Sequence, residues 1–323
     1  MSERGYRYQG EVMKKFVPLI FAIIFLAGCT GSTVKTDANN GISISRFAAT
    51  PSEDKEGGLI LFDAELENVG GTTARNVKVD LFGVENQWRN VDGSLVTSTL
   101  TKFGTLSLNP PNIQRQLPGG FRVAQWQIMT PDIPQGVSPA LPVEVRVEFD
   151  YNTSGHLLIP VVSDQEFEIR RIKGQSIASP QIVNSNGPLK ITIPERFSRF
   201  IIVETEDPSP TESVSLRIEF TNVGDGFPIT EGDTGKITGT IEVFGPGAEF
   251  EDCLGATSGK RADLDNSEIT TKLRDTQSVP VACTIKISKA QWGGRAEDSI
   301  QLNFNIFYRY FVRDSARVTV FGR

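Results

Sequence analysis

Apolar and polar side chains alternate along most of the chain after Gly41. The alternation is regular over residues 60–66 and 143–151, and again over 214–220 and 300–310. Successive side chains of a strand point to opposite faces of a sheet, so each run predicts a strand with one buried face. Segments with the 3.6-residue period of a helix are scarce. The pattern therefore predicts an all-β protein with antiparallel sheets.

Two of these runs are followed by residues that favour turns. Asn-Thr-Ser-Gly at 152–155 precedes a further apolar run over 156–162, and Arg-Asp-Ser at 313–315 precedes another over 316–321. Because Asn, Asp, Ser and Gly favour turns, we expect a β-hairpin at each place. Many short strands separated by such turns predict β-sandwiches.

The second half of the chain repeats several short phrases of the first half. The repeats are Asn68-Val69-Gly70 with Asn222-Val223-Gly224, Phe82-Gly83 with Phe244-Gly245, and Gln125-Trp126 with Gln291-Trp292. Gly accepts the positive φ of a turn, so Asn-Val-Gly indicates a strand end followed by a turn. The repeats predict two related domains, with chance similarity of short stretches as the alternative.

The N-terminal segment has the pattern of an export signal. Lys14 and Lys15 precede an apolar run that closes in Leu26-Ala27-Gly28-Cys29. The run of about a dozen residues is short of the roughly 20 that span a bilayer. These four residues resemble the lipobox of bacterial lipoprotein precursors. The resemblance implies cleavage before Cys29 and a thioether-linked diacylglycerol on its thiol, so that the membrane is one partner. An uncleaved anchor or an ordinary signal peptide is the alternative.

A second resemblance covers residues 43–165. Ala74-Arg75-Asn76-Val77-Lys78-Val79, after Asn68-Val69-Gly70, and Phe149-Asp150-Tyr151 resemble the CARDB-type immunoglobulin-like modules of bacterial and archaeal surface proteins. The resemblance implies a surface interaction or spacer role without chemistry of its own. The second half departs from it, because no Ala-x-Asn-Val phrase follows Asn222-Val223-Gly224.

The domain limits follow from these signals and from one polar stretch. Residues 173–187 are rich in Ser, Gln, Asn and Gly, which is typical of a linker. The expected fold class is all-β, with two tandem immunoglobulin-like antiparallel β-sandwiches after an N-terminal lipoprotein signal peptide. The limits are a signal peptide at 1–28, a flexible tether at 29–41, one sandwich at 42–172, a linker at 173–187, and a second sandwich with a long insertion at 188–323.

Charge and composition exclude several functions. The net charge is −6, and no dense basic run follows the signal segment, which argues against nucleic acid as a partner. One histidine and three cysteines are too few for the usual Cys/His zinc clusters. No cofactor is expected.

Two cysteines remain if Cys29 carries the lipid. Cys253 and Cys283 would meet an oxidising compartment after export, so we expect a disulfide between them. A loop of about 30 residues closed in this way contributes roughly 3 to 4 kcal/mol in the chain-entropy treatment. Two buried free thiols are the alternative.

The remaining candidate residues give weaker signals. His156, the only histidine, lacks a nucleophile motif around it, so no catalytic residue is expected. Asp263, Asp265 and Glu268 form an oxygen-rich stretch that is weakly indicative of calcium, although a solvated acidic turn fits as well. Asn152 begins an Asn-x-Ser glycosylation pattern of low specificity. Aromatic residues at strand spacing indicate core more than a ligand platform; these are Phe121, Trp126, Tyr151, Tyr308 and Tyr310.

Together these observations predict an exported, membrane-anchored cell-envelope lipoprotein that acts as a non-catalytic binding or spacer module on the extracytoplasmic side. Its second partner would be a protein or an envelope polymer, added at an edge strand or docked on loops. The alternatives are an envelope carbohydrate-active enzyme or a substrate-binding lipoprotein. An acidic cleft with two carboxylates about 5 to 10 Å apart would favour the enzyme.

Overall fold

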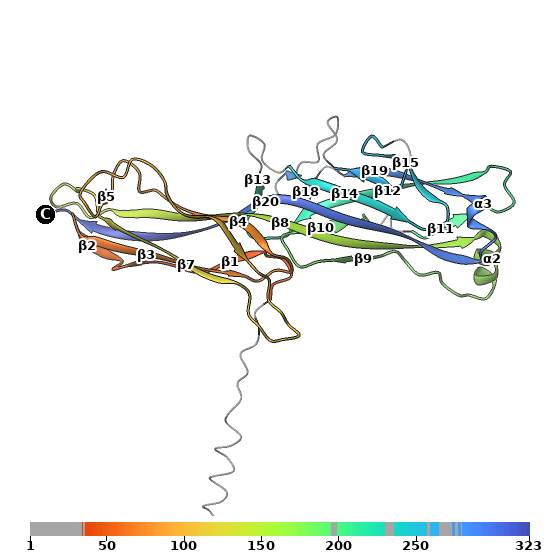
Figure 1. Ribbon diagram of the computed structural model, residues 1–323, viewed down its shortest axis with the longest axis horizontal. Coiled ribbons are helices and arrows are strands. Elements are labelled where there is room, and N and C mark those ends of the chain that lie inside the picture. Colours follow the sequence, from red (N-terminus) through yellow and green to blue (C-terminus); the bar gives the residue numbers. More distant parts are fainter. Residues whose placement is uncertain are drawn as a thin grey trace, which may run out of the picture. The chain divides into compact units, whose positions relative to one another are not determined.

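The computed structural model describes residues 34, 36–194, 199–229, 236–256, 259–264, 273–274, 277–278 and 280–323, with the backbone alone at 273–274 and 277–278. The chain divides into two compact units, Met1–Val34 and Lys35–Arg323. All of the elements described below belong to the second unit, and Figure 1 shows how they are arranged within it.

The described strands of this unit form three sheets, two small and one long. The first small sheet has the strand order β1 (Ile42–Thr50), β3 (Leu59–Asn68), β7 (Phe121–Met129) and β5 (Arg89–Asn90). The second has the order β15 (Ala248–Cys253), β19 (Val281–Ser288), β12 (Thr211–Asn222), β18 (Gln277–Ser278) and β17 (Leu273–Arg274), with β10 (Leu189–Thr192) also paired to β12.

The long sheet has the order β16 (Arg261–Asp263), β14 (Thr238–Phe244), β20 (Glu297–Phe321), β8 (Ala140–Ser163), β4 (Ala74–Phe82) and β6 (Leu100–Leu108). Four short strands extend it: β9 (Gln181–Asn184) and β11 (Ile201–Val203) pair with β8, and β13 (Phe227–Ile229) and β2 (Glu53–Lys55) pair with β20. Two helices, α2 (Asp164–Ile172) and α3 (Lys289–Trp292), follow β8 and β19.

The prediction of an all-β, antiparallel fold is confirmed. Among the described strands only β2 and β11 pair in parallel, both with ends of the two longest strands. The immunoglobulin-like topology of the two tandem domains, and the domain limits drawn from the sequence, stay predictions.

The longest strands, β8 and β20, run side by side through both halves of the unit (Figure 1). They have 24 and 25 residues, and every residue from Ala140 to Val162 on β8 pairs with one on β20 without a register shift. The two hairpins expected from the sequence are therefore wrong, because residues 152–155 and 313–315 lie inside these unbroken strands.

The phase of the alternation explains why β8 does not turn. Odd-numbered residues face the core from Val143 to Val161, and the stretch 152–155 does not shift that phase, because Thr153 and Gly155 stay on the buried face. Gly155 is needed there, since a Cβ at this position would collide with the Ile191 side chain of β10. In β20 the even-numbered residues stay inward on both sides of 313–315, with Val312 and Val318 both buried.

The long sheet packs on the two small sheets, one beside each half of the β8–β20 pair. In the first half, the Trp126 indole of β7 donates a hydrogen bond to the Leu100 carbonyl of β6 at 3.0 Å, which joins the two layers. The buried side chains form one hydrophobic cluster that includes Ile60 of β3, Val145 of β8 and Ile285 of β19. The prediction of β-sandwich packing is thereby confirmed, with a core that continues from one sandwich into the other.

The strand order of the long sheet is the same when read outward from either central strand. Beside β8 lie β4 and then β6, and beside β20 lie β14 and then β16. The small sheets match as well, since β3 lies between β1 and β7, and β12 lies between β10 and β19. The two halves are therefore structural repeats, related through the β8–β20 pair.

The sequence repeats agree with this only in part. Asn68 and Asn222 end the equivalent strands β3 and β12, so the Asn-Val-Gly repeat marks equivalent positions. The Gln-Trp repeat does not, because Trp126 lies in β7 whereas Trp292 lies in α3. Phe62 and Leu216 occupy equivalent positions before Asn68 and Asn222. Phe62 pairs with Trp126, whereas Leu216 pairs with Cys283, so Trp126 is replaced by a cysteine in the second half.

The helix α2 begins where β8 ends. Ser163 caps it by accepting a hydrogen bond from the Glu166 backbone N–H at 3.1 Å, a common way to satisfy a free amide of the first turn.

The expected linker at 173–187 contains β9, which pairs with β8. No helix in the described part of the chain is both long and apolar enough to cross a membrane.

Candidate functional site

The two Asn-Val-Gly corners lie at the middle of the β8–β20 pair, where each is held by a tyrosine. In the first corner, the Asn68 side-chain amide donates to the Thr72 carbonyl at 2.8 Å, and the Gly70 N–H donates to Asn68 Oδ1 at 3.1 Å. The Thr72 N–H donates to the hydroxyl of Tyr151, a residue of β8, at 3.1 Å.

The second corner repeats these bonds with residues of the other half. The Asn222 side-chain amide donates to the Gly226 carbonyl at 2.8 Å, and the Gly226 N–H donates to the Tyr310 hydroxyl of β20 at 3.0 Å. The Tyr310 hydroxyl in turn donates to Asn222 Oδ1 at 2.9 Å. Tyr151 and Tyr310 are therefore equivalent residues of the two repeats, and each holds the corner of its own repeat.

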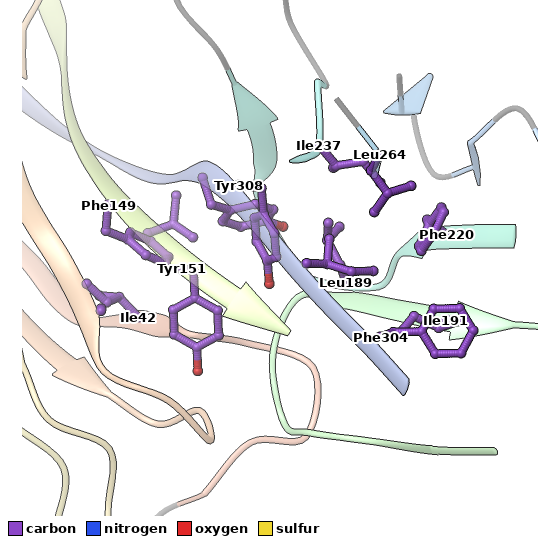
Figure 2. Close-up of a cluster of buried hydrophobic side chains, with 14 of the residues drawn as sticks. Ile42, Phe149, Tyr151, Leu189, Ile191, Phe220, Ile237, Leu264, Phe304 and Tyr308 are labelled. Atoms are coloured by element: carbon purple, nitrogen blue, oxygen red, sulfur yellow. The ribbon is translucent and has the colours of Figure 1, made fainter. Parts of the chain in front are cut away.

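A third tyrosine completes the group that we call the junction tyrosines, Tyr151, Tyr308 and Tyr310. The Tyr308 hydroxyl is 2.8 Å from the Thr153 hydroxyl in a buried pair, and its ring centroid is 6.1 Å from that of Tyr151. Figure 2 shows Phe149, Tyr151 and Tyr308 together with core residues of both halves. Burial raises the pKa of all three phenols, so they stay protonated and act as hydrogen-bonding groups rather than as acids or bases.

The corners also contact each other across the repeat boundary. The Asn40 side-chain amide donates to Asp225 Oδ2 at 3.1 Å, and the Asp225 N–H donates to Asn40 Oδ1 at 3.2 Å. The Gly71 N–H donates to the Asn186 carbonyl at 3.1 Å. We call this region, the two corners with the junction tyrosines, the strand junction. Its hydrogen bonds between Asn40 and Asp225, and from Gly71 to Asn186, join the two repeats.

The outer face of the β8–β20 pair carries the residues that sequence reasoning considered for chemistry. His156 Nδ1 lies 2.8 Å from Asn303 Oδ1, and the Asn152 amide donates to Asn305 Oδ1 at 3.3 Å. His156 thus has an amide partner, with no carboxylate or nucleophile hydrogen-bonded to its ring among the described residues. Asn152 lies in an unbroken strand rather than in the loop that a glycosylation acceptor usually occupies.

Surface hollows near the start of β8 and near the strand junction are the next features of the described part of the chain. The larger, of about 380 Å³, is lined mainly by Phe82, Pro142, Glu144 and Arg146. The smaller, of about 110 Å³, lies between β1 and the middle of β20 and is lined by Ile42, Ser43, Ile44, Asp225, Arg313 and Asp314. The smaller hollow adjoins a stretch of β20 whose outer side is paired with none of the described strands, and β1 lies across the hollow from it.

We call this stretch the open edge, meaning the backbone of residues 312–318 on the side away from β8. On that side β14 pairs with residues 301–307, β13 with 309–311 and β2 with 319–321. Among the described strands none pairs with the residues between Phe311 and Thr319 there. Unpaired edge backbone of this kind is the usual acceptor for a strand from another chain.

The remaining predicted site residues have different outcomes. The disulfide between Cys253 and Cys283 is present, joins β15 to β19 and is buried. Asp263 lies in β16 and forms an ion pair with Arg261 at 3.1 Å. Cys29, Asp265 and Glu268 lie outside the described residues. Within the described ranges no group of three His, Cys, Asp or Glu side chains is placed to hold a metal ion.

Of the aromatic residues, Trp126 and the junction tyrosines are buried, as expected for core, whereas Phe121 is exposed. The pairing of each corner with a tyrosine was missed at the level of sequence. Its signal was the Asn-x-Gly repeat together with a tyrosine at the end of the long alternating run of each half.

Comparisons with known proteins give no family for this chain. No protein family matches the sequence, and no curated protein matches it. Matches to solved structures include the Pseudomonas fluorescens alkylpurine DNA glycosylase bound to DNA containing an abasic site analog, at 14% identity and a TM-score of 0.20 over 34% of this chain and 27% of the other. The chain thus spans about a quarter of the glycosylase.

Two adhesins also match over most of the chain. An Enterococcus faecalis MSCRAMM, described as binding its ligands by the collagen hug model, is 8% identical with a TM-score of 0.18 over 89% of this chain and 97% of the other. A collagen adhesin from S. aureus is 10% identical with a TM-score of 0.11 over 90% and 96%. At these TM-scores the likenesses carry no argument about the function of this chain.

Proposed function

We propose that the protein is a lipid-anchored, extracytoplasmic spacer module with a rigid body that does no chemistry of its own. The observation that carries this proposal is the unbroken β8–β20 pair, which is shared by both repeats. A shared pair of strands replaces the flexible linker that normally separates tandem domains.

The pair is long enough to act as a spacer. At about 3.3 Å per residue, the stretch from Ala140 to Val162 extends about 75 Å. Its inner face is covered by the core along nearly this whole length, because side chains from Val143 to Val161 of β8 are buried at every second position. Bending the pair would expose the side chains of that core to water, so the packing favours an unbent β8–β20 pair of constant length.

The strand junction stiffens the middle of the pair, where a hinge would otherwise be expected. Each corner is bonded to a tyrosine of a central strand, and Asn40 and Asp225 join the two corners. The bonds that cross the repeat boundary, between Asn40 and Asp225 and from the Gly71 N–H to the Asn186 carbonyl, are lost if one repeat rotates against the other. A bend at this place therefore has to break several partly or fully buried hydrogen bonds together, each worth about 1 kcal/mol.

Attachment to a membrane is proposed from the lipobox at Leu26-Ala27-Gly28-Cys29. Each buried methylene of a lipid contributes about 0.8 kcal/mol to anchoring, so a diacylglycerol gives stable attachment. Membrane attachment and export also account for a disulfide between Cys253 and Cys283, which forms in oxidising compartments.

Anchoring is tested by Cys29→Ser in the full chain. We expect the wild-type protein to incorporate labelled fatty acid and to fractionate with membranes, and the variant to do neither, because serine offers no thiol for the thioether. Equal labelling and equal membrane association of the variant would remove the anchor from the proposal.

Rigidity is tested separately with spin labels at Leu158→Cys and Arg317→Cys, which lie on the exposed outer face of the pair. Arg317 pairs with Pro142, so the labelled backbone positions are about 50 Å apart at 3.3 Å per residue. A single narrow distance distribution by double electron–electron resonance supports a rigid spacer. A broad or two-peaked distribution would show a hinge and contradict it.

A further inference from the structure

We propose that the open edge of β20 accepts an extended segment of a partner polypeptide, added as a short antiparallel strand with acidic side chains on its solvent-facing side. This proposal adds a binding activity to the spacer role and does not depend on the lipid anchor. It rests on a difference between two repeats that otherwise match strand for strand.

The equivalent edge of β8 is already paired, and its partner shows what kind of segment fits the open edge. The strand β9 pairs antiparallel with Gly155 to Leu158, the residues four to seven positions after Tyr151. The residues four to seven positions after the equivalent Tyr310 are Asp314 to Arg317, in the middle of the open edge. The same ladder position is thus filled by an extended segment in one repeat and left open in the other.

The backbone of the open edge is oriented for pairing. The Thr319 N–H donates to the Ser52 carbonyl on the side of β2, whereas the Val320 N–H donates to the Pro139 carbonyl on the side of the segment that leads into β8. Because N–H groups alternate along a strand, those of Arg313, Ser315 and Arg317 point outward with that of Thr319. The Ser315 N–H bonds to the side chain of Asp314 at 2.7 Å, and those of the two arginines have no bonding partner among the described residues.

The side chains of the open edge indicate the chemistry of the partner. Arg317 is exposed, and no described carboxylate lies within ion-pair distance of it. Arg313 has only a 3.8 Å contact with Glu144. Across an antiparallel pair, opposite charges on one face stabilise the pairing, so an acidic residue opposite Arg317 is favoured.

A second copy of this chain fits less well. If two open edges paired antiparallel about Ser315, Arg313 of each copy would lie opposite Arg317 of the other. Like charges directly opposite one another destabilise such a pair. The charges therefore favour a different chain over self-association.

The test uses a fluorescently labelled peptide of residues Pro180–Ser185 carrying Gln181→Glu, added to the full chain and followed by fluorescence anisotropy. The residues of this peptide form the strand that fills the equivalent edge, and the substitution places a carboxylate opposite Arg317. We expect saturable binding with a Kd on the order of 1 mM or tighter and none for a peptide of scrambled order.

Three variants separate the contribution of the outward backbone N–H to peptide binding from that of the Arg317 charge. Arg317→Pro removes an outward N–H, and we expect it to fold normally and to weaken binding at least about tenfold, since Pro is tolerated on the open side of an edge. Arg317→Gln keeps the N–H and should weaken binding by a smaller factor. Ala316→Pro is the matched control for the direction of the backbone N–H. It removes an inward N–H that is bonded to β8, so it should lower the melting temperature.

Hydrogen exchange of the fragment that contains 313–317 gives a second readout. We expect fast exchange of its outward amides without peptide and slower exchange with it. Protection without peptide would overturn the proposal, because another part of the chain or a second copy would then already cover the edge. The absence of saturable binding at millimolar peptide, equal binding by Arg317→Pro, or a concentration-dependent dimer abolished by that variant would overturn it as well.

Discussion

Replacing Tyr310 with phenylalanine is the most direct test of how the second Asn-Val-Gly corner is held against β20. The substitution keeps the ring, which is fully buried, and removes only the hydroxyl. That hydroxyl accepts a hydrogen bond from the Gly226 N–H at 3.0 Å and donates one to Asn222 Oδ1 at 2.9 Å. Tyr310→Phe therefore removes two buried hydrogen bonds without making a large cavity.

The magnitude follows from which group is left without a partner. Asn222 Oδ1 still accepts from the Gly224 N–H at 3.3 Å, so it keeps one bond. The buried Gly226 N–H keeps none, and an unsatisfied buried donor destabilises a protein by about 1 to 3 kcal/mol. We expect Tyr310→Phe to lower the free energy of unfolding by an amount in that range.

Urea unfolding followed by circular dichroism measures this change, and Tyr151→Phe is the matched control in the other repeat. The hydroxyl of Tyr151 accepts from the Thr72 N–H at 3.1 Å in a partly buried setting, where water can replace it. The Tyr151 variant should lose less stability than the Tyr310 variant. A loss below about 0.5 kcal/mol for Tyr310→Phe would refute the argument that the corner depends on this bond.

Three further predictions concern the same fold. The junction tyrosines have raised pKa values, so the folded state holds their protons more tightly than the unfolded state. We therefore expect their full contribution to the free energy of unfolding below about pH 10. Above that pH the free energy of unfolding should fall by about 1.4 kcal/mol per pH unit for each tyrosine. Absorbance at 295 nm should show their ionisation together with unfolding. The double variant Cys253→Ala and Cys283→Ala should lose about 3 to 4 kcal/mol in urea unfolding, since a separation of 30 residues is no longer closed. Gly70→Ala should destabilise by several kcal/mol, because its Cβ would overlap the Tyr151 hydroxyl and the Asn40 carbonyl, whereas Gly104→Ala, with open space around it, should be nearly neutral by melting temperature.

The strands could be predicted from sequence because burial on one face leaves a period of two along each of them. The runs at 143–151 and 300–310 were recognised in this way, and both lie in the long strands that the structure shows. What failed was the interpretation of 152–155 and 313–315 as turns. Their composition favours turns, but the phase of the alternation continues through them, and pairing with a strand about 150 residues away keeps each one straight.

The candidate sites also differ in how far they could be predicted from the sequence. The Cys253–Cys283 bond could be predicted from the cysteine count together with the expectation of export, since few pairings were possible. The open edge could not, because it depends on which strands become neighbours, and a sequence shows a strand without showing what lies beside it. The equivalence of Tyr151 and Tyr310 likewise appears only when both corners are seen in three dimensions.

The sharing of β20 between the repeats has a consequence for how the protein matures. The second half of this strand, from Arg309 to Thr319, pairs with Ala140 to Asp150 of β8, so the N-terminal sandwich is completed by residues that are synthesised long after its other strands. Contacts so distant in sequence form slowly and leave partly folded chains with exposed strands in the meantime. The first sandwich therefore stays incomplete and prone to mispairing until β20 has been synthesised.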